Sequence, residues 1–308
     1  MRALIFPGQG SQAVGMGAAL AGASRTAKDV FDEVDEALGQ SLFRLMRDGP
    51  DDDLKLTENA QPAIMANSIA VLRTMGLQLA DVAAFVAGHS LGEYSALCAA
   101  GSFDLATTAK LLKLRGQAMQ QAVPVGVGAM AALLGADLTL AQRIAEAAAQ
   151  GEVCSVANDN DPSQVVISGH KGAIDRAIEM AKDMGAKRAI PLPVSAPFHC
   201  PLMQPAAEAM SDALSYVVLK PPAVPVFANV TGQPESDGDT IRNQLVEQVT
   251  GMVRWRESIA NMAAAGVDDF VEIGGKVLGS MVKRIAPDAK VTSVVTIEDI
   301  ESLAKEIA

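Results

Sequence analysis

The chain has 308 residues, of which 49% are hydrophobic, and it carries a formal net charge of −11. This charge disfavours nucleic acid as a partner, because phosphate binding needs a concentrated positive field, and no apolar stretch reaches the ~20 residues needed to cross a bilayer. Three scattered cysteines and the lack of a signal-peptide pattern predict a globular cytoplasmic protein with free thiols.

The chain opens with a predicted strand, Arg2–Phe6, which leads directly into the loop PGQGSQ at residues 7–12. If the strand is part of a parallel sheet, this loop lies at the carboxyl edge, where the backbone N–H of Gln9 could face an oxyanion. The alternative is a dinucleotide-binding fingerprint, since Gly8, Gly10 and Ala13 fit its looser form. That motif needs a second strand ending in an acid, whereas residues 28–38 have helical periodicity.

The strongest local pattern is GHSLG at residues 88–92, which directly follows an apolar run at residues 83–87. A buried strand, a G-x-S-x-G turn and a helix of small residues are typical of a nucleophile elbow, in which the serine sits on a strained turn above the sheet. Side chains at Gly88 and Gly92 would collide with the neighbouring strand and helix. The pattern predicts Ser90 as a nucleophile and the N–H of Leu91 as the partner of Gln9 in an oxyanion hole.

Helices are predicted at residues 61–74, with Pro62 in the first turn, and at residues 104–121. In the second helix, Arg115 shares an apolar face with Leu111, Leu112 and Met119. A guanidinium held among apolar side chains needs an anionic partner. An internal ion pair or a side chain reaching to water is one interpretation. Bidentate capture of a substrate carboxylate, which the planar guanidinium suits, is the other.

Past Pro124 the predicted order is β-α-β-β-α-β, with strands near residues 129–134, 153–157, 164–168 and 189–192 and helices at 139–150 and 171–184. This order is typical of a ferredoxin-like subdomain, which we place at residues 125–191. Residues 1–124 and 192–308 add strands at 224–230, 269–273 and 291–295. The fold prediction is α/β: an α/β-hydrolase-like main domain with a parallel sheet, an inserted ferredoxin-like small domain, and a ligand cleft between them.

Three histidines are available as the general base for Ser90. His89 is its neighbour in the elbow, where side chains diverge, and His170 opens a helix, where we expect it to face solvent. His199 precedes a predicted helix at residues 201–215 in the main domain and is the preferred base. No acid between Ser90 and His199 ends a convincing main-domain strand. We therefore expect a carbonyl or amide to orient the imidazole in a dyad.

Five motifs occur together in this chain: FPGQGSQ at residues 6–12, GHSLGE at 88–93, Arg115-Gly116, NDN at 158–160 and SAPFH at 195–199. With this combination the chain resembles malonyl-CoA:acyl-carrier-protein transacylases and their polyketide-synthase relatives nearly end to end. The resemblance implies a ping-pong reaction that supplies fatty acid synthesis. Ser90 would take malonyl from malonyl-CoA and pass it to the phosphopantetheine thiol of acyl carrier protein, with no metal or redox cofactor.

The resemblance also implies a role for each site residue. His199 would activate Ser90, and Gln9 and Leu91 would form the oxyanion hole. Arg115 would hold the malonyl carboxylate, and Gln248, in a segment matching the family's Q-x-x-x-x-x-x-W, would position His199 in place of an acid.

Three further residues are expected to contact the substrate: Phe198, Asn158 and Asn160. Phe198 narrows the space beside the acyl α-carbon, so we expect malonyl to be preferred over methylmalonyl, and comparable turnover of both thioesters would contradict this. One segment departs from the family. Its usual Gly-Pro-Gly-Lys loop is replaced by the shorter GGK at residues 274–276, which puts the loop geometry in doubt.

An acidic carrier protein must dock on a local positive patch of this acidic chain, for which we expect one of three pairs: Lys187/Arg188, Arg254/Arg256 or Lys283/Arg284. The segment RWR at residues 254–256 is otherwise interpreted as a surface helix or loop, and the chain is expected to be a monomer. Three rival functions stay open: a serine esterase or thioesterase, which would have no use for Arg115, a non-catalytic carrier-binding module, and a dehydrogenase.

Overall fold

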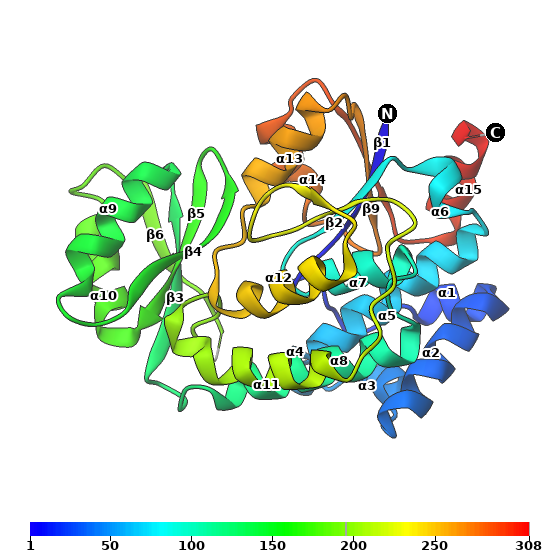
Figure 1. Ribbon diagram of the computed structural model, residues 1–308, viewed down its shortest axis with the longest axis horizontal. Helices are drawn as coiled ribbons and strands as arrows, with labels where there is room; N and C mark the ends of the chain where they lie inside the picture. The colour runs from blue at the N-terminus through cyan, green and yellow to red at the C-terminus, as the bar shows by residue number, and fades with distance from the viewer. Residues whose placement is uncertain (195, 308) are drawn as a thin grey trace.

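The computed structural model describes residues 1–194 and 196–307, so Ser195 of the SAPFH motif lies outside the described residues. Two sheets with surrounding helices make up this described part of the chain (Figure 1). The main sheet has the strand order β10-β9-β1-β2-β7-β8, and every pairing in it is parallel except β7 with β8. Its strands are β1 Arg2–Phe6, β2 Phe85–Gly88, β7 Val226–Phe227, β8 Pro234–Glu235, β9 Asp269–Ile273 and β10 Lys290–Val294.

Both faces of the main sheet are covered by helices, as the apolar runs of its strands require. Leu4 and Phe6 of β1 point to one face, and Ala3 and Ile5 point to the other, because strand side chains alternate. The first face packs against α2 Arg25–Leu38, α5 Thr57–Met75, α7 Gly92–Ala99 and α8 Leu105–Gln121, and the second against α13 Trp255–Ala264 and α14 Gly279–Ile285. The remaining helices are α1 Ala18–Ala23, α3 Leu42–Asp48, α4 Asp51–Lys55, α6 Leu79–Val82, η1 Pro201–Met203, α11 Gln204–Ser215, α12 Gly238–Thr250 and α15 Ile297–Ile307.

The second sheet is antiparallel and has the order β4-β5-β3-β6, with α9 Leu138–Ala149 and α10 Lys171–Ala181 on one face (Figure 1). Its strands are β3 Gly128–Leu134, β4 Cys154–Asp161, β5 Gln164–His170 and β6 Arg188–Pro191. The β-α-β-β-α-β order and the mixed α/β architecture confirm the fold class. Met130, Ala132 and Val166 belong to the core of the main domain, whereas Ala131 and Leu133 pack under α9 and α10. One face of the small sheet therefore looks toward the main domain.

Three local predictions were wrong. The strand expected at residues 224–230 is only two residues long, because the chain turns after it and pairs Ala228 N–H with the carbonyl of Gln233. Helix α5 begins four residues earlier than expected, so Pro62 lies in its second turn. Trp255 is fully buried rather than on a surface segment. None of the described helices is both long and apolar enough to span a membrane.

Candidate active site

Ser90 lies on the turn between β2 and α7, at the carboxyl edge of the main sheet, and its φ of 54° is the strained left-handed value of a nucleophile elbow. The turn leaves no room for side chains at the two glycines. A Cβ on Gly88 would lie 1.9 Å from the carbonyl of Gly92, and a Cβ on Gly92 would lie 2.3 Å from the carbonyl oxygen of Phe6. The elbow geometry predicted from G-x-S-x-G is therefore present.

His199 is the histidine that contacts Ser90. The Ser90 hydroxyl donates to His199 Nε2 over 2.8 Å, and Nδ1–H donates to the main-chain carbonyl of Gln248 over 2.8 Å. This second bond fixes the tautomer that leaves Nε2 free to accept a proton. Burial, together with the nearby positive charge of Arg115, lowers the pKa of His199 to about 3. The imidazole is therefore neutral in the resting site.

The other two histidines make different contacts. His89 bonds through Nε2 to Asn160 Oδ1 at 2.8 Å and lies edge-on to the ring of Trp255. His170 accepts a hydrogen bond from the N–H of Val153 and is half-buried rather than freely exposed. Neither of these imidazoles is hydrogen-bonded to Ser90 Oγ, whereas that of His199 is, and its role as the base stays a prediction.

Arg115 reaches the nucleophile from α8 and is only 1% exposed. Its guanidinium donates to Gln61 Oε1 at 2.8 Å, to Gln248 Oε1 at 2.9 Å and to Ser90 Oγ at 3.2 Å, and it lies over the ring of Tyr94. All three acceptors are neutral, and among the described residues no carboxylate forms an ion pair with it. The internal ion pair considered from the sequence is therefore absent from the described part of the chain. A buried cation with neutral partners is suited to receive an anionic ligand.

Gln248 forms hydrogen bonds with both His199 and Arg115. Its main-chain carbonyl, rather than its side chain, holds His199, while its side-chain oxygen accepts from Arg115. Its Nε2 donates to Glu93 Oε2 at 2.7 Å and to the carbonyl of Ser90 at 3.0 Å. Glu93 is 1% exposed and also accepts the N–H of Asn229. Burial raises the pKa of Glu93 to about 7, although these hydrogen bonds and Arg115 act in the opposite direction.

Leu91, one of the two predicted oxyanion donors, directly follows the serine, and the other, Gln9, lies on the loop after β1. The N–H of Ser90 is already bonded to Asn229 Oδ1 at 2.8 Å, whereas the N–H of Leu91 donates to no described backbone acceptor outside helices and strands. Gly8 packs against the elbow so closely that a Cβ there would lie 2.7 Å from the carbonyl oxygen of His89. This contact places the loop that carries Gln9 over the same edge of the sheet.

The structure gives contacts for the three remaining predicted residues. Asn160 holds His89, and Asn158 pairs with Val253 in an isolated parallel bridge, so both tie the small sheet to the main domain. Phe198 directly precedes the base and is 8% exposed within the core cluster that also contains Leu91. Their expected roles in substrate binding stay predictions.

The shortened loop at residues 274–276 lies between the buried carboxylate of Glu272 and helix α5. Glu272 is fully buried and accepts the N–H groups of Val277, Leu278 and Gly279 at the start of α14. Gly274 has a φ of 82°, and its carbonyl accepts from Asn67 Nδ2. The loop therefore closes on α5 and on the buried carboxylate of Glu272.

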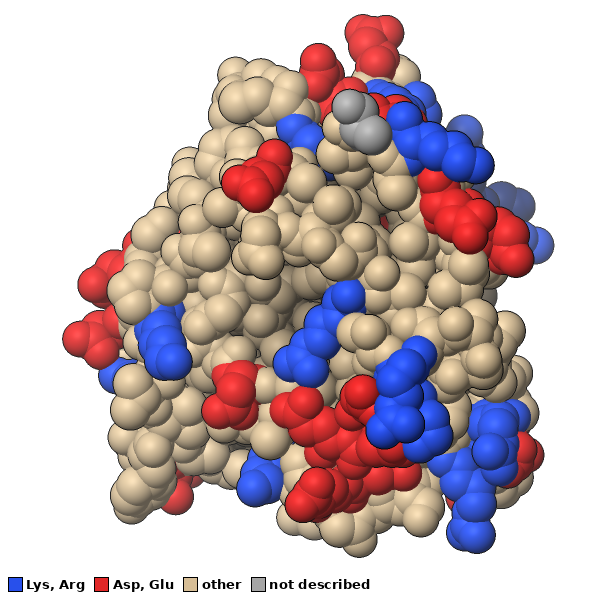
Figure 2. All heavy atoms as spheres, turned by 90° about the vertical axis from the view of Figure 1, so that its right-hand side faces the viewer, with Lys and Arg blue, Asp and Glu red and all other residues tan. Residues whose placement is uncertain are grey.

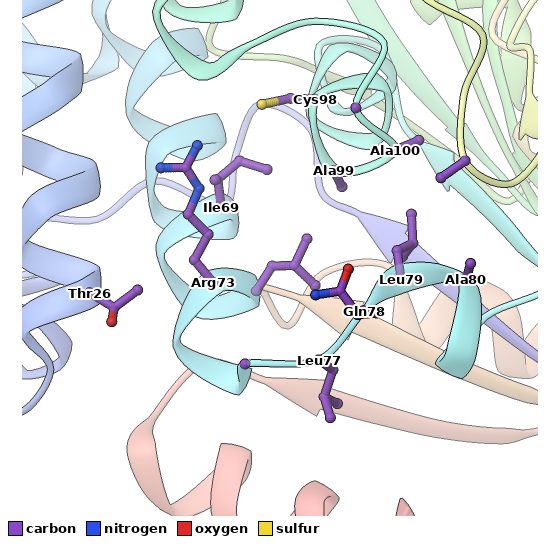
Figure 3. A pocket seen from close by; sticks show the side chains of 14 residues that line it. Thr26, Ile69, Arg73, Leu77, Gln78, Leu79, Ala80, Cys98, Ala99 and Ala100 are labelled. Carbon is purple, nitrogen blue, oxygen red and sulfur yellow. The ribbon is translucent and has the colours of Figure 1, made fainter.

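A cavity of about 540 Å³ opens on another side of the molecule, between α5, α6 and the end of α7. Figure 3 shows its lining, which includes Arg73, Leu77, Gln78 and Cys98 and none of the residues around Ser90.

On the face seen in Figure 2, basic side chains are mixed with acidic ones and form no extended positive patch. Within the described residues, no group of three or more His, Cys, Asp or Glu side chains could hold a metal ion.

Comparison with known proteins places this geometry in a family. Residues 3–291 match the acyl transferase domain family. This chain belongs to that acyl transferase family. It is 47% identical to the malonyl CoA-acyl carrier protein transacylase of Escherichia coli K12 over 284 residues, 92% of each chain. The structure of an acyl-carrier-protein S-malonyltransferase from Bartonella henselae superposes with a TM-score of 0.97 at 52% identity, over 99% of both chains.

A third acyl transferase was solved as a malonyl-transacylase in complex with a type II polyketide-synthase acyl-carrier protein. It superposes with a TM-score of 0.96 at 40% identity, over 99% of both chains. These matches confirm the family resemblance found from the motifs.

Sequence reasoning missed three residues that contact the site: Gln61, Glu93 and Asn229. Glu93 is the last residue of the GHSLGE motif. Asn229 follows strand β7, and this position at the carboxyl edge of the sheet could have indicated that Asn229 lies near Ser90. Gln61 is a buried polar residue in an apolar helix, a pattern that indicates an internal hydrogen-bond partner.

Proposed function

We propose that this chain transfers a malonyl group from malonyl-CoA to the phosphopantetheine thiol of an acyl carrier protein, through a malonyl-serine intermediate, and so supplies fatty acid synthesis. One observation carries this function: the Ser90 hydroxyl lies within hydrogen-bond distance of both a neutral imidazole and a buried cation. The base activates the nucleophile, and the cation selects an acyl group that bears a carboxylate. The names of the chain's relatives support the same reaction.

In the first half-reaction, Ser90 Oγ attacks the thioester carbonyl while its proton passes to His199 Nε2. The carbonyl oxygen becomes an oxyanion, which the N–H groups of Gln9 and Leu91 stabilise. The C–S bond then breaks, and the thiolate of coenzyme A leaves with the proton from His199. The carbonyl of Gln248 stabilises the transient imidazolium as a neutral acceptor, so no carboxylate is needed.

The second half-reaction is the reverse with a different thiol. The phosphopantetheine thiol gives its proton to His199 and attacks the malonyl-serine carbonyl, and Ser90 recovers a proton as it leaves. Arg115 holds the malonyl carboxylate through both steps, because its bidentate geometry fits a carboxylate. Transfer rather than hydrolysis requires that water be kept from the acyl-enzyme.

Intact-protein mass spectrometry after brief incubation with malonyl-CoA tests this function. We expect one malonyl adduct on the wild type and none on Ser90→Ala, and we expect the adduct to move to holo acyl carrier protein when that protein is added. An adduct that is lost to water at the same rate with or without the carrier would instead identify a hydrolase. Failure of the wild type to form any adduct would leave only a binding module.

We further propose that Arg188 lies at the carrier-docking surface. The other two predicted pairs are largely engaged: Arg256 and Arg284 bind the buried carboxylates of Asp159 and Asp161. Arg188 is exposed and takes part in no ion pair among the described residues. It pairs with Leu134 in the register, so it shares the sheet face of Ala132, which looks toward the main domain.

Charge reversal tests this surface. We expect Arg188→Glu to raise the KM for acyl carrier protein while formation of the malonyl-enzyme stays unchanged, because rim charges act mainly on association. Arg25→Glu, a change of the same charge at an exposed position on α2, serves as the control. Equal loss of both half-reactions in Arg188→Glu would contradict the docking role.

A further inference from the structure

Glu93 is a buried carboxylate that the reaction itself does not use. Its side chain is 1% exposed, and it contacts neither Ser90 Oγ nor the Arg115 guanidinium by a hydrogen bond. Within the described part of the chain, it accepts hydrogen bonds from Gln248 Nε2 at 2.7 Å and from the N–H of Asn229 at 3.1 Å. Burying a carboxylate is costly unless it is paired, so its position beside the nucleophile calls for a functional reason.

Gln248, one of the partners of Glu93, also hydrogen-bonds to Arg115 and, through its main chain, to His199. Gln248 presents its side-chain oxygen to Arg115 and its Nε2 to Glu93. If this amide rotated by half a turn, its NH₂ group would face the guanidinium, donor against donor, and its oxygen would face the carboxylate. Glu93 provides the shortest of the contacts to Gln248 Nε2 and therefore favours the orientation in which the amide oxygen meets Arg115.

Without that acceptor, Gln248 Nε2 would keep two partners, the carbonyl of Ser90 at 3.0 Å and Asn229 Oδ1 at 3.3 Å. Both contacts are longer than the 2.7 Å bond to Glu93, so the amide would be held less firmly in the orientation that presents its oxygen to Arg115 Nη2. Arg115 would then lose one of the neutral acceptors that hold its guanidinium at the nucleophile.

We propose that Glu93 is a positioning residue for substrate selection: its carboxylate oxygen orients the Gln248 amide, which in turn holds Arg115 in place to receive the carboxylate of the acyl group. This inference rests on the proposed malonyl transfer and deepens it. Glu93 acts through hydrogen-bond geometry rather than as a counter-charge. The difference matters, because removing a counter-charge would make Arg115 more attractive to an anionic substrate.

The test compares malonyl-CoA with acetyl-CoA, which lacks the carboxylate and so offers Arg115 no anion to bind. Glu93→Met keeps the volume but removes the acceptor, and Glu93→Gln keeps an acceptor oxygen but removes the charge. We expect the malonyl-to-acetyl ratio of kcat/KM for Ser90 acylation to fall about tenfold in Glu93→Met, mainly through KM, and to stay within about threefold of wild type in Glu93→Gln.

Gln248→Met provides the background in which to test whether Glu93 acts through the side-chain amide of Gln248. It removes the side-chain amide but leaves the main-chain carbonyl that holds His199. If Glu93 acts through that amide, adding Glu93→Met to Gln248→Met changes the ratio by less than about twofold. Glu272→Gln is the matched control, since it alters another fully buried carboxylate that caps α14 and contacts none of these residues. Its ratio should equal that of the wild type.

The outcomes separate the possible roles. Equal losses with both thioesters in Glu93→Met would show a merely structural role, and a higher ratio in both Glu93 variants would show a counter-charge role; either result overturns the proposal. Because the ratio is taken per active site, partial unfolding does not imitate it. Failure of the wild type to accept malonyl would refute the proposed function instead, so the two failures are distinguishable.

Discussion

The low pKa of His199 predicts that the reactivity of the Ser90 hydroxyl depends little on pH between 5 and 7. Burial and Arg115 lower the pKa of this imidazole from its ordinary 6.5 to about 3. A base with the ordinary pKa would be about 76% neutral at pH 7 and about 3% neutral at pH 5, so the reactivity of Ser90 would fall about 25-fold. With a pKa of about 3, the imidazole stays about 99% neutral at pH 5. Because a lowered pKa keeps the neutral base down to more acidic pH, we expect almost no loss over this interval.

The assay is the rate of Ser90 inactivation by a neutral sulfonyl fluoride between pH 5 and 8, followed by intact mass. A neutral reagent offers Arg115 no anion to bind, so the profile reports the serine and its base in the resting site. Ser90→Ala gives the background rate, and circular dichroism at each pH shows that the protein remains folded. A fall of tenfold or more with a midpoint near pH 6.5 would refute the argument that the buried imidazole is held neutral.

Two substitutions test other parts of the site. Arg115→Met should lower kcat/KM for malonyl-CoA about 100-fold and leave acetyl-CoA within about threefold, since charge-assisted bonds to the carboxylate are lost; equal losses with both thioesters would show that Arg115 only supports the fold. Gly88→Ala should destabilise the protein by about 3 kcal/mol in urea denaturation, because its Cβ would lie 1.9 Å from backbone atoms of Gly92. A loss below about 1 kcal/mol would mean that the elbow can relax.

The sequence predicted those elements whose signal is local. Strands β1 and β9 were placed correctly because each is a short segment of mainly apolar residues that leads into a glycine-containing loop. The strand around β7 was predicted too long because Ala228 and Val230 are apolar, although the backbone turns there to return as β8. Hydrophobicity reports burial, and a buried turn has the same composition as a buried strand.

The start of α5 could not be read from composition either. Pro62 indicated a first turn at Gln61, yet the helix begins at Thr57. Its first residues are held by a tertiary contact with α8, where a Cβ on Gly116 would lie 2.5 Å from Glu58 Cα. The glycine after Arg115 thus permits a close crossing of two helices, which brings Gln61 to the guanidinium. A contact between residues so far apart in sequence leaves no local pattern.

The sequence indicated candidate site residues more readily than the hydrogen bonds between them. Ser90 was predicted from a motif, His199 by elimination and Arg115 from a charge on an apolar face; the structure brings these three side chains together, and their roles stay predictions. The expectation of a neutral acceptor in place of an acid agrees with the carbonyl of Gln248, but the sequence could not distinguish the main chain of that residue from its side chain. Every residue has a carbonyl, so only the fold decides which one meets Nδ1.

The position of Arg115 leads to one more expectation about selectivity. In the resting site the guanidinium donates to Ser90 Oγ, and its charge contributes to the low pKa of His199. A malonyl carboxylate bound to Arg115 would offset that charge and make His199 a stronger base, whereas acetyl-CoA brings no such anion. The substrate carboxylate should therefore act on the chemical step as well as on binding. We expect single-turnover acylation to be faster at saturating malonyl-CoA than at saturating acetyl-CoA; equal saturating rates would show that Arg115 contributes to affinity alone.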